Sequence, residues 1–182
     1  MLYIQDIDLT PNPNALKFVV NDFLLFREKR SFTNKPDAAN DPLARKIFNI
    51  NGVVSVFYTD KFITVEKEPS GNWNSIQKSL SLLIRNFDRS LIPAEKEINQ
   101  PADNLESPEF KKIKSIIDQR VRPALESDGG GLDLLDFHDN TLKIRYIGAC
   151  GTCPSSIRGT LVAIENLLKR EIDPEIKVIS AI

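Results

Sequence analysis

The sequence predicts an α+β protein made of two small α/β domains joined by a flexible linker. Three observations support this prediction. Short strand-like runs alternate along the chain with segments of helical periodicity. Residues 93–107 contain two prolines and few large apolar side chains, which is typical of a linker. The 182 residues, 41% of them hydrophobic, are enough for one large or two small cores. We therefore expect domains at residues 1–92 and 108–182, with the linker at residues 93–107.

The first domain begins with two strand candidates, residues 2–6 and 15–20. Between them, residues 9–14 contain two prolines and two asparagines, which favour a rigid turn over regular structure. Residues 27–40 are mostly polar and are expected to form a loop.

The rest of this domain is predicted as a short helix, a hairpin and a longer helix. Asp41 is a suitable N-cap for the short helix at residues 42–50. Residues 53–59 and 62–66 are β-branched and aromatic runs that predict the hairpin. Residues 73–89 predict the longer helix, because large apolar side chains recur there at steps of three and four. These side chains are Trp73, Ile76, Leu80, Leu83, Ile84 and Phe87.

The second domain opens with Ser107 as a helix cap. Its first helix is predicted to bury one apolar face and to bend or end near Pro123. That face consists of Phe110, Ile113, Ile116, Ile117, Val121 and Leu125. The elements that follow are a turn at residues 128–131, a hairpin of residues 132–138 and 141–147, the loop that carries both cysteines, a helix at residues 154–170 and a strand at residues 176–179.

Composition and charge exclude several classes of protein. A net charge of −1 gives no reason to expect nucleic acid or an anionic membrane as a partner. The first residues lack the order of a secretory signal, and no apolar run approaches the roughly 18 residues that span a bilayer. We expect a cytoplasmic protein of bacterial type, with a mature mitochondrial form as the alternative.

The chain has only two cysteines, Cys150 and Cys153, three positions apart between a predicted strand and a predicted helix. This spacing favours a metal or redox role in a reducing compartment. Both thiols would lie near the positive end of the helix dipole, which favours the thiolate form. Gly148 and Gly151 allow the backbone to turn tightly there. Because soft metal centres usually use four thiolates, a complete site requires a second copy of the chain, and it would be exposed and shared.

Two other uses of the same cysteines remain open. A thiol–disulfide oxidoreductase would use Cys150 as its attacking thiol, and a zinc ion could bridge two chains as a dimerisation module. Two features count against the oxidoreductase. The strand before the loop alternates between polar and apolar residues, whereas the corresponding redox strand is covered on both faces. Only 29 residues follow Cys153, too few for the remaining strands of that fold.

Other polar residues are expected to have structural roles. His138 lies in a turn and is expected to be solvated, and no partner for a catalytic triad can be assigned to it. Asp128, Asp133 and Asp136 are interpreted as turn-forming or solvent-facing residues. Ser155 and Ser156 are expected to cap the helix that follows the cysteines.

Three segments resemble the Nfu-type, NifU-like family of iron–sulfur scaffold proteins. They are RPALESDGG at residues 122–130, GACGTCPSS at residues 148–156 and TPNPNALKF at residues 10–18. The first two are similar to the NifU C-terminal domain, and the third is similar to the Nfu N-terminal domain. The family often has an acidic residue after its paired glycines, whereas this chain has Gly131. That departure predicts a looser turn without a loss of ligands.

The resemblance implies a scaffold or carrier rather than an enzyme. It implies that Cys150 and Cys153 are ligands of a [4Fe–4S] cluster shared between the two subunits of a homodimer. It further implies delivery to apo iron–sulfur client proteins and contact with upstream scaffold proteins. The N-terminal domain is expected to contribute recognition of these partners, and neither nucleic acid nor a membrane is expected among them.

Overall fold

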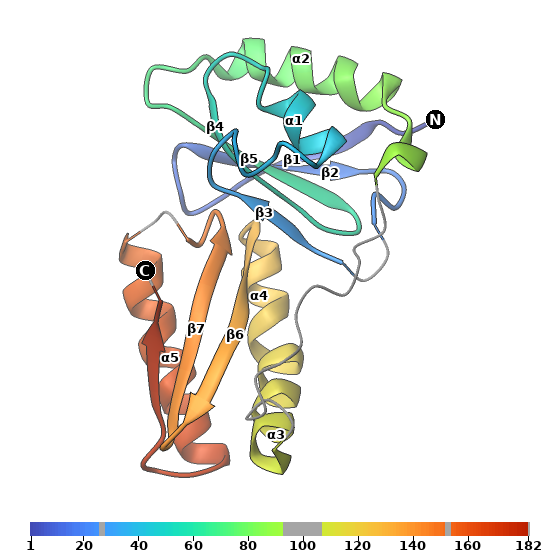
Figure 1. Ribbon diagram of the computed structural model, residues 1–182. Helices are drawn as coiled ribbons and strands as arrows, with labels where there is room; N and C mark the ends of the chain where they lie inside the picture. The colour runs from blue at the N-terminus through green and yellow to red at the C-terminus, as the bar shows by residue number, and fades with distance from the viewer. Residues whose placement is uncertain (26–27, 93–106, 152–153, 182) are drawn as a thin grey trace. The chain divides into compact units, whose positions relative to one another are not determined.

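Each half of the chain combines helices with a β-sheet, which confirms the predicted α+β class (Figure 1). The computed structural model describes residues 1–25, 28–92, 107–151 and 154–181. The chain divides into two compact units, Met1–Lys96 and Glu97–Ile182. Almost the whole predicted linker lies outside the described residues, so its flexibility and the exact domain boundaries stay predictions. No helix in the described part of the chain is long and apolar enough to cross a membrane.

The N-terminal unit is built on a five-stranded antiparallel sheet. Its strands, in the order in which they lie, are β1 (Ile4–Leu9), β2 (Ala15–Val20), β5 (Phe62–Lys67), β4 (Val53–Tyr58) and β3 (Arg30–Phe32). The helices are α1 (Pro42–Ile47), α2 (Trp73–Asn86) and a 3-10 turn, η1 (Arg89–Leu91). The buried side chains of α2 are Ile76, Leu80 and Ile84, which confirms the predicted apolar face.

The turn between β1 and β2 is organised by Asn12. Its side chain is buried, and its Oδ1 accepts a hydrogen bond of 2.9 Å from the backbone N–H of Asn14. The backbone N–H of Ala15 donates to the Asn12 carbonyl at 3.0 Å. A side chain that bonds to the backbone two residues later defines an Asx turn, so the predicted rigid turn is confirmed.

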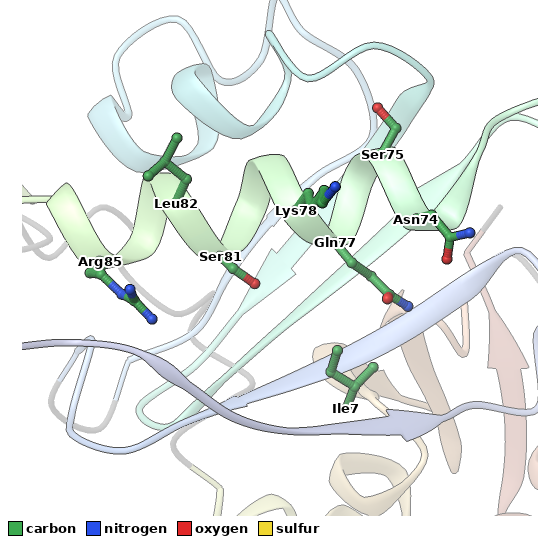
Figure 2. Close-up of a pocket in the computed structure, with 8 residues that line it drawn as sticks. All are labelled: Ile7, Asn74, Ser75, Gln77, Lys78, Ser81, Leu82 and Arg85. Atoms are coloured by element: carbon green, nitrogen blue, oxygen red, sulfur yellow. The ribbon is translucent and has the colours of Figure 1, made fainter.

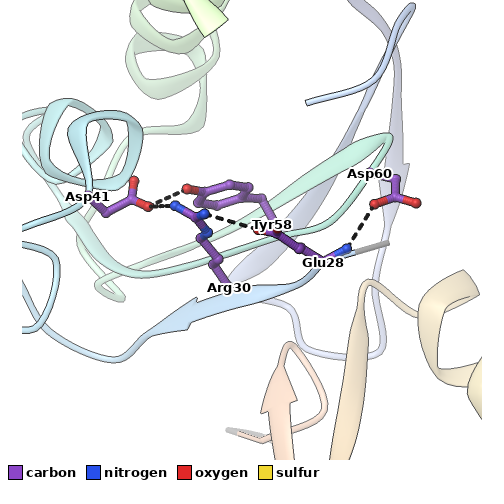
Figure 3. A network of polar contacts seen from close by, with 5 residues as sticks. All are labelled: Glu28, Arg30, Asp41, Tyr58 and Asp60. Carbon is purple, nitrogen blue, oxygen red and sulfur yellow. Dashed lines mark hydrogen bonds and ion pairs between the residues drawn. The ribbon is translucent and has the colours of Figure 1, made fainter. Parts of the chain in front are cut away.

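Part of the predicted loop at residues 27–40 is a strand, so that prediction was wrong for β3. The reason is a buried polar network that joins β3 to β4 and α1 (Figure 3). The Asp41 carboxylate caps α1 by accepting from the Ala44 N–H at 2.8 Å. It also accepts from Arg30 Nη1 at 2.8 Å and from the Tyr58 hydroxyl at 2.5 Å. Three donors on one buried carboxylate therefore hold a polar edge strand in the sheet.

The C-terminal unit contains a three-stranded sheet with the order β6-β7-β8. β6 pairs with β7 in antiparallel fashion, and β8 pairs with β7 in parallel. The elements are α3 (Pro108–Ile116), the π-helical turn η3 (Ile117–Val121), α4 (Arg122–Ser127), β6 (Gly130–His138), β7 (Thr141–Gly148), α5 (Pro154–Glu171) and β8 (Lys177–Ser180). All bounds agree with the predicted elements to within a few residues.

Pro123 is accommodated by a change of helix type. The proline lies in the first turn of α4, directly after η3. Proline has no N–H and its ring excludes the usual i−4 carbonyl, so the preceding turn widens to the π form instead of the helix simply ending. The predicted apolar face nevertheless continues through the break, since Phe110, Ile113, Ile117 and Leu125 are all buried in one core.

Candidate metal centre

The cysteine loop connects the end of β7 to the beginning of α5. β7 ends at Gly148, Cys150 lies in the turn that follows, and α5 begins at Pro154, as the sequence predicted. Cys153 lies outside the described residues, so its ligand role stays a prediction. The start of an 18-residue helix directly after the loop places the positive end of a helix dipole beside it.

Glycines make the tight path of the chain before Cys150 possible. Gly129 and Gly148 have φ angles of 75° and 65°, a left-handed region that favours glycine. They lie at the end of the β6–β7 hairpin, where Gly130 pairs with Gly148. The Ala149 N–H donates to the Gly129 carbonyl at 3.2 Å, and the Gly151 N–H donates to the Gly148 carbonyl at 3.0 Å. These two bonds hold the turn closed against the end of the sheet.

Cys150 is buried in the core of the unit and has only 5% of its surface exposed. Gly130 makes this position possible. A methyl group added at residue 130 would lie 2.5 Å from Cys150 Sγ and 2.8 Å from the Cys150 backbone nitrogen. The sulfur therefore occupies the space that a side chain at residue 130 would fill. The expectation that the site is exposed is wrong for Cys150 in this structure.

Tyr146 lies on the strand that leads to Cys150, and its side chain is also buried in the core. Its hydroxyl oxygen is buried and has no hydrogen-bond partner among the residues that the structure describes. Burial raises the pKa of the Tyr146 phenol, and the negative charge of the Cys150 thiolate raises it further. The hydroxyl is therefore a protonated donor near Cys150.

Other residues singled out in the sequence do not join this site. Within the described ranges, no three His, Cys, Asp or Glu side chains are placed to hold a metal ion. His138 is exposed next to Asp139, as expected for a turn residue. Asp133 accepts a hydrogen bond from Arg145 at 3.1 Å. Asp136 was expected to face solvent but is half-buried, because a bulge between Leu134 and Asp136 interrupts the alternation of β6.

Comparison with known proteins places the chain in a family. A model described as "Scaffold protein Nfu/NifU N terminal" matches residues 4–90, and one described as "NifU-like domain" matches residues 113–179. The human protein named "NFU1 iron-sulfur cluster scaffold homolog, mitochondrial" is 36% identical over 181 residues, which cover 97% of this chain and 70% of the human protein. The chain belongs to the Nfu-type, NifU-like family.

A second Nfu relative carries the same name in Drosophila virilis. It is 33% identical over 186 residues, which cover 100% of this chain and 62% of the fly protein. The chain therefore spans less than two thirds of the length of that relative. Among solved structures, a NifU-like protein from Saccharomyces cerevisiae has 31% sequence identity and a TM-score of 0.40, with 44% of this chain and 75% of that chain covered.

Gly131, where the Nfu family often has an acidic residue, belongs to β6 rather than to the turn. It is buried and pairs with Ile147. The glycine therefore lies beyond the turn, and a looser turn at this place stays a prediction. Sequence reasoning missed the contact of Gly130 with Cys150 and the burial of Tyr146. The available signal for Tyr146 was a phenol on the buried side of the strand, four residues before the first cysteine.

The N-terminal unit contains a surface groove that the sequence did not predict (Figure 2). It has a volume of about 920 Å³ and lies between Ile7 of β1 and the side of α2 that faces away from the core. Lys78 and Arg85 contribute two cations to its lining, and Leu82 contributes an exposed apolar side chain. No acidic side chain is among the lining residues.

Proposed function

We propose that this chain is an iron–sulfur cluster carrier that holds a [4Fe–4S] cluster between two copies and transfers it to apo iron–sulfur proteins. The observation that carries the proposal is a pair of cysteines between β7 and α5 in a chain of the Nfu family. The names printed for the relatives, which describe iron–sulfur cluster scaffolds, support it. The role is that of a carrier and not of a catalyst.

The number of thiolates supports a cluster shared by two chains. A cubane cluster or a tetrahedral metal usually takes four thiolates. One chain supplies two, Cys150 and Cys153, so a homodimer joined loop to loop would supply the full set. A cluster held between two protein surfaces is accessible to a third protein, which suits transfer more than permanent storage.

The buried position of Cys150 adds a condition to this proposal. Its sulfur packs against Gly130 and must turn outward before a second chain can share a ligand with it. The loop contains Gly148 and Gly151, which lower the steric cost of changing the backbone there. We therefore expect loading to involve a rearrangement of residues 148–151.

One observation favours the carrier over the alternative oxidoreductase. The side chains of β7 alternate between buried and exposed, with Lys143 and Arg145 exposed, unlike a strand covered on both faces. The zinc-bridged dimer uses the same ligands, so only metal analysis separates it from the cluster carrier.

Anaerobic reconstitution with iron and sulfide tests the proposal. We expect a brown dimer with about four iron and four sulfide ions per two chains. Absorption spectra, metal and sulfide analysis and size-exclusion chromatography measure this outcome. A colourless monomer that cycles a disulfide would support the oxidoreductase, and a dimer that retains only zinc would support the dimerisation module.

Cysteine variants test the assignment of ligands. We expect Cys150→Ala and Cys153→Ala each to abolish cluster binding and cluster-dependent dimerisation, since either change leaves at most two thiolates per dimer. Circular dichroism of the apoproteins should remain close to that of the wild type, because each unit is stabilised by its own apolar core. Full cluster occupancy in either variant would contradict the assignment.

We propose that the N-terminal unit recognises client proteins and that its groove receives an acidic segment of a client. Charge complementarity supports this choice, because the lining contains Lys78 and Arg85 and no carboxylate. The double variant Lys78→Glu and Arg85→Glu should slow transfer to such a client without changing cluster content. A matched variant, Lys35→Glu and Arg45→Glu, makes the same change in net charge at exposed sites outside the groove and should transfer normally.

The compartment stays a prediction. The relatives are named as mitochondrial proteins, whereas the expectation for this chain is the cytoplasm. Fractionation of source cells with an antibody against the chain would separate the two possibilities.

A further inference from the structure

One edge of the N-terminal sheet lies beside the groove. β1 is the first strand in the order of this sheet and pairs with β2 on one side, with no strand beyond it in the described part of the chain. The groove is lined by Ile7 of β1 and by residues of α2, and Figure 2 shows Gln77 and Arg85 extending from the helix toward β1. Extended peptides bind sites of this kind by adding a strand to the edge.

The direction of the β1 backbone groups follows from the register with β2. The N–H of Asn21, the residue after β2, donates at 3.1 Å to a carbonyl of the chain just before β1, so it faces β1. Backbone groups alternate in direction along a strand, so Lys17, four residues earlier, also faces β1 and bonds its partner Asp8. The backbone groups of Ile7 and Leu9, on either side of Asp8, therefore face away from β2 and toward the open edge.

The N–H of Ile7 agrees with this direction. It donates at 2.8 Å to the carboxylate of the preceding residue, Asp6, and this bond is exposed. A charged side chain on an edge strand protects the edge from unwanted pairing. Because the bond is local and exposed, an incoming strand can replace it at little cost.

The charges of the groove indicate which kind of strand fits. Lys78 and Arg85 are seven residues apart, almost two helical turns, so they lie on one side of α2 and about 10 Å apart along its axis. Side chains on one face of a strand repeat at every second residue, about 6.7 Å. Acidic residues at alternate positions of a bound strand would therefore meet both cations, and no carboxylate among the lining residues would repel them.

We propose that an acidic segment of a client protein binds in the groove as an additional strand of the sheet, with hydrogen bonds to the backbone of Ile7 and Leu9. The inference rests on the proposed function, because it specifies how the groove receives the client segment. The two parts of the site have different tasks. The backbone of β1 holds an extended segment, and Lys78 and Arg85 select one that is acidic.

The probe is a peptide of about eight residues, long enough to span β1, in which glutamate alternates with threonine. We expect saturable binding to the apo form of the whole chain, with the amide protons of Ile7 and Leu9 becoming protected from exchange in NMR spectra. Methylating every second backbone nitrogen of the peptide should weaken binding roughly ten-fold for one of the two alternating sets and leave it unchanged for the other, since one side of an added strand bonds β1. Replacing the glutamates by lysines should abolish binding.

Variants of Asp6 separate strand addition from simple attraction of charge. Asp6→Ala and Asp6→Asn remove the same negative charge, but asparagine keeps an oxygen that can accept from the Ile7 N–H. We expect Asp6→Ala to bind the peptide roughly three-fold more tightly than Asp6→Asn, the effect of one weak hydrogen bond. Equal affinities would show that the Ile7 N–H takes no part in binding and would overturn the inference.

Three further outcomes would overturn it. Equal binding of the two methylated peptides would leave the groove as a purely electrostatic site. Absence of saturable binding would remove the edge from recognition, whereas cluster reconstitution and transfer would still decide the carrier function separately. A dimer of the apoprotein that Leu9→Pro dissolves and Leu9→Ala retains would assign the edge to a second copy of the chain, because proline removes the N–H of Leu9 that faces the edge.

Discussion

Asp41 is a buried residue whose carboxylate accepts hydrogen bonds from three donors in the N-terminal unit. Its side chain and that of Arg30 are 5% and 9% exposed, and the pair is tied further to the Tyr58 hydroxyl. Removing one partner from a buried ion pair leaves an uncompensated charge, which is strongly destabilising. Burial raises the pKa of Tyr58, and its hydrogen bond to Asp41 raises it further, so the phenol remains a donor across the physiological range.

We expect Asp41→Ala to destabilise the N-terminal unit by roughly 3–5 kcal/mol. The loss should exceed that of Asn72→Ala, which removes an exposed helix cap from α2 and should cost only about 1 kcal/mol. Trp73 is the only tryptophan of the chain and belongs to this unit, so its fluorescence during urea unfolding reports on it. Equal effects of the two variants would show that the network adds nothing beyond an ordinary cap.

Gly130 offers a test of the same kind in the C-terminal unit. We expect Gly130→Ala to displace the Cys150 loop and to speed cluster loading, because the new methyl group would lie 2.5 Å from Cys150 Sγ and would favour the outward position that loading requires. Gly159→Ala is the matched control. Nothing lies within 4 Å of that position in α5, so the change should leave the loading rate unaltered and stabilise the helix by about 0.5–1 kcal/mol. A wild-type loading rate in the Gly130→Ala protein would contradict the close contact.

At the level of elements, the break between α3 and α4 is held together by charged side chains. Asp118 accepts hydrogen bonds from Lys114 at 3.2 Å and from Arg122 Nε at 2.9 Å. Arg122 Nη1 also donates to the Leu132 carbonyl at 3.0 Å and so ties α4 to β6. Partial burial acts to raise the pKa of Asp118, but the bonds from Arg122 and Lys114 outweigh it, and the pKa lies below its ordinary value.

This lowered pKa predicts an acid-sensitive contribution to stability. A carboxylate with a lower pKa in the folded state stabilises the fold above its unfolded pKa, about 3.9, and the contribution is lost as the pH falls through the folded pKa. We expect wild-type protein to lose more stability between pH 5 and pH 3 than Asp118→Asn. Urea unfolding followed by circular dichroism measures the difference. Parallel losses in the two proteins would show that Asp118 contributes nothing.

Most elements were predictable from the sequence because their signals are local. The type of β6–β7 turn, for example, follows from Asp139 and Asn140, whose φ angles of 45° and 55° suit a two-residue hairpin. β3 was missed because it has only three residues and its edge position depends on Arg30 reaching a carboxylate eleven residues away. The site was only half predictable. Spacing identified the two cysteines, but the burial of Cys150 depends on Gly130, a contact that joins residues 20 positions apart.

For the whole molecule, the two units have separate hydrophobic cores, so the proposed separation of cluster binding from client recognition can be tested by deleting one unit. The N-terminal core and the C-terminal core each consist of residues from one unit only. We expect a protein that lacks residues 1–92 to bind a cluster as well as the full chain does but to deliver it more slowly to some clients. Transfer rates to a panel of apo iron–sulfur proteins measure this. Equal transfer rates from the full chain and from the shortened protein to every client would show that the N-terminal unit does not contribute to client recognition.

The contact between Gly130 and Cys150 also bears on how the sulfur responds to oxidants. Oxidation of a cysteine by peroxide requires an accessible thiolate, and a sulfur packed against the end of a hairpin is not accessible. In the closed form, Cys150 is therefore protected from sulfinic and sulfonic acid formation, which would end its use as a ligand. We expect Cys150 to react with peroxide more slowly than an exposed thiolate would.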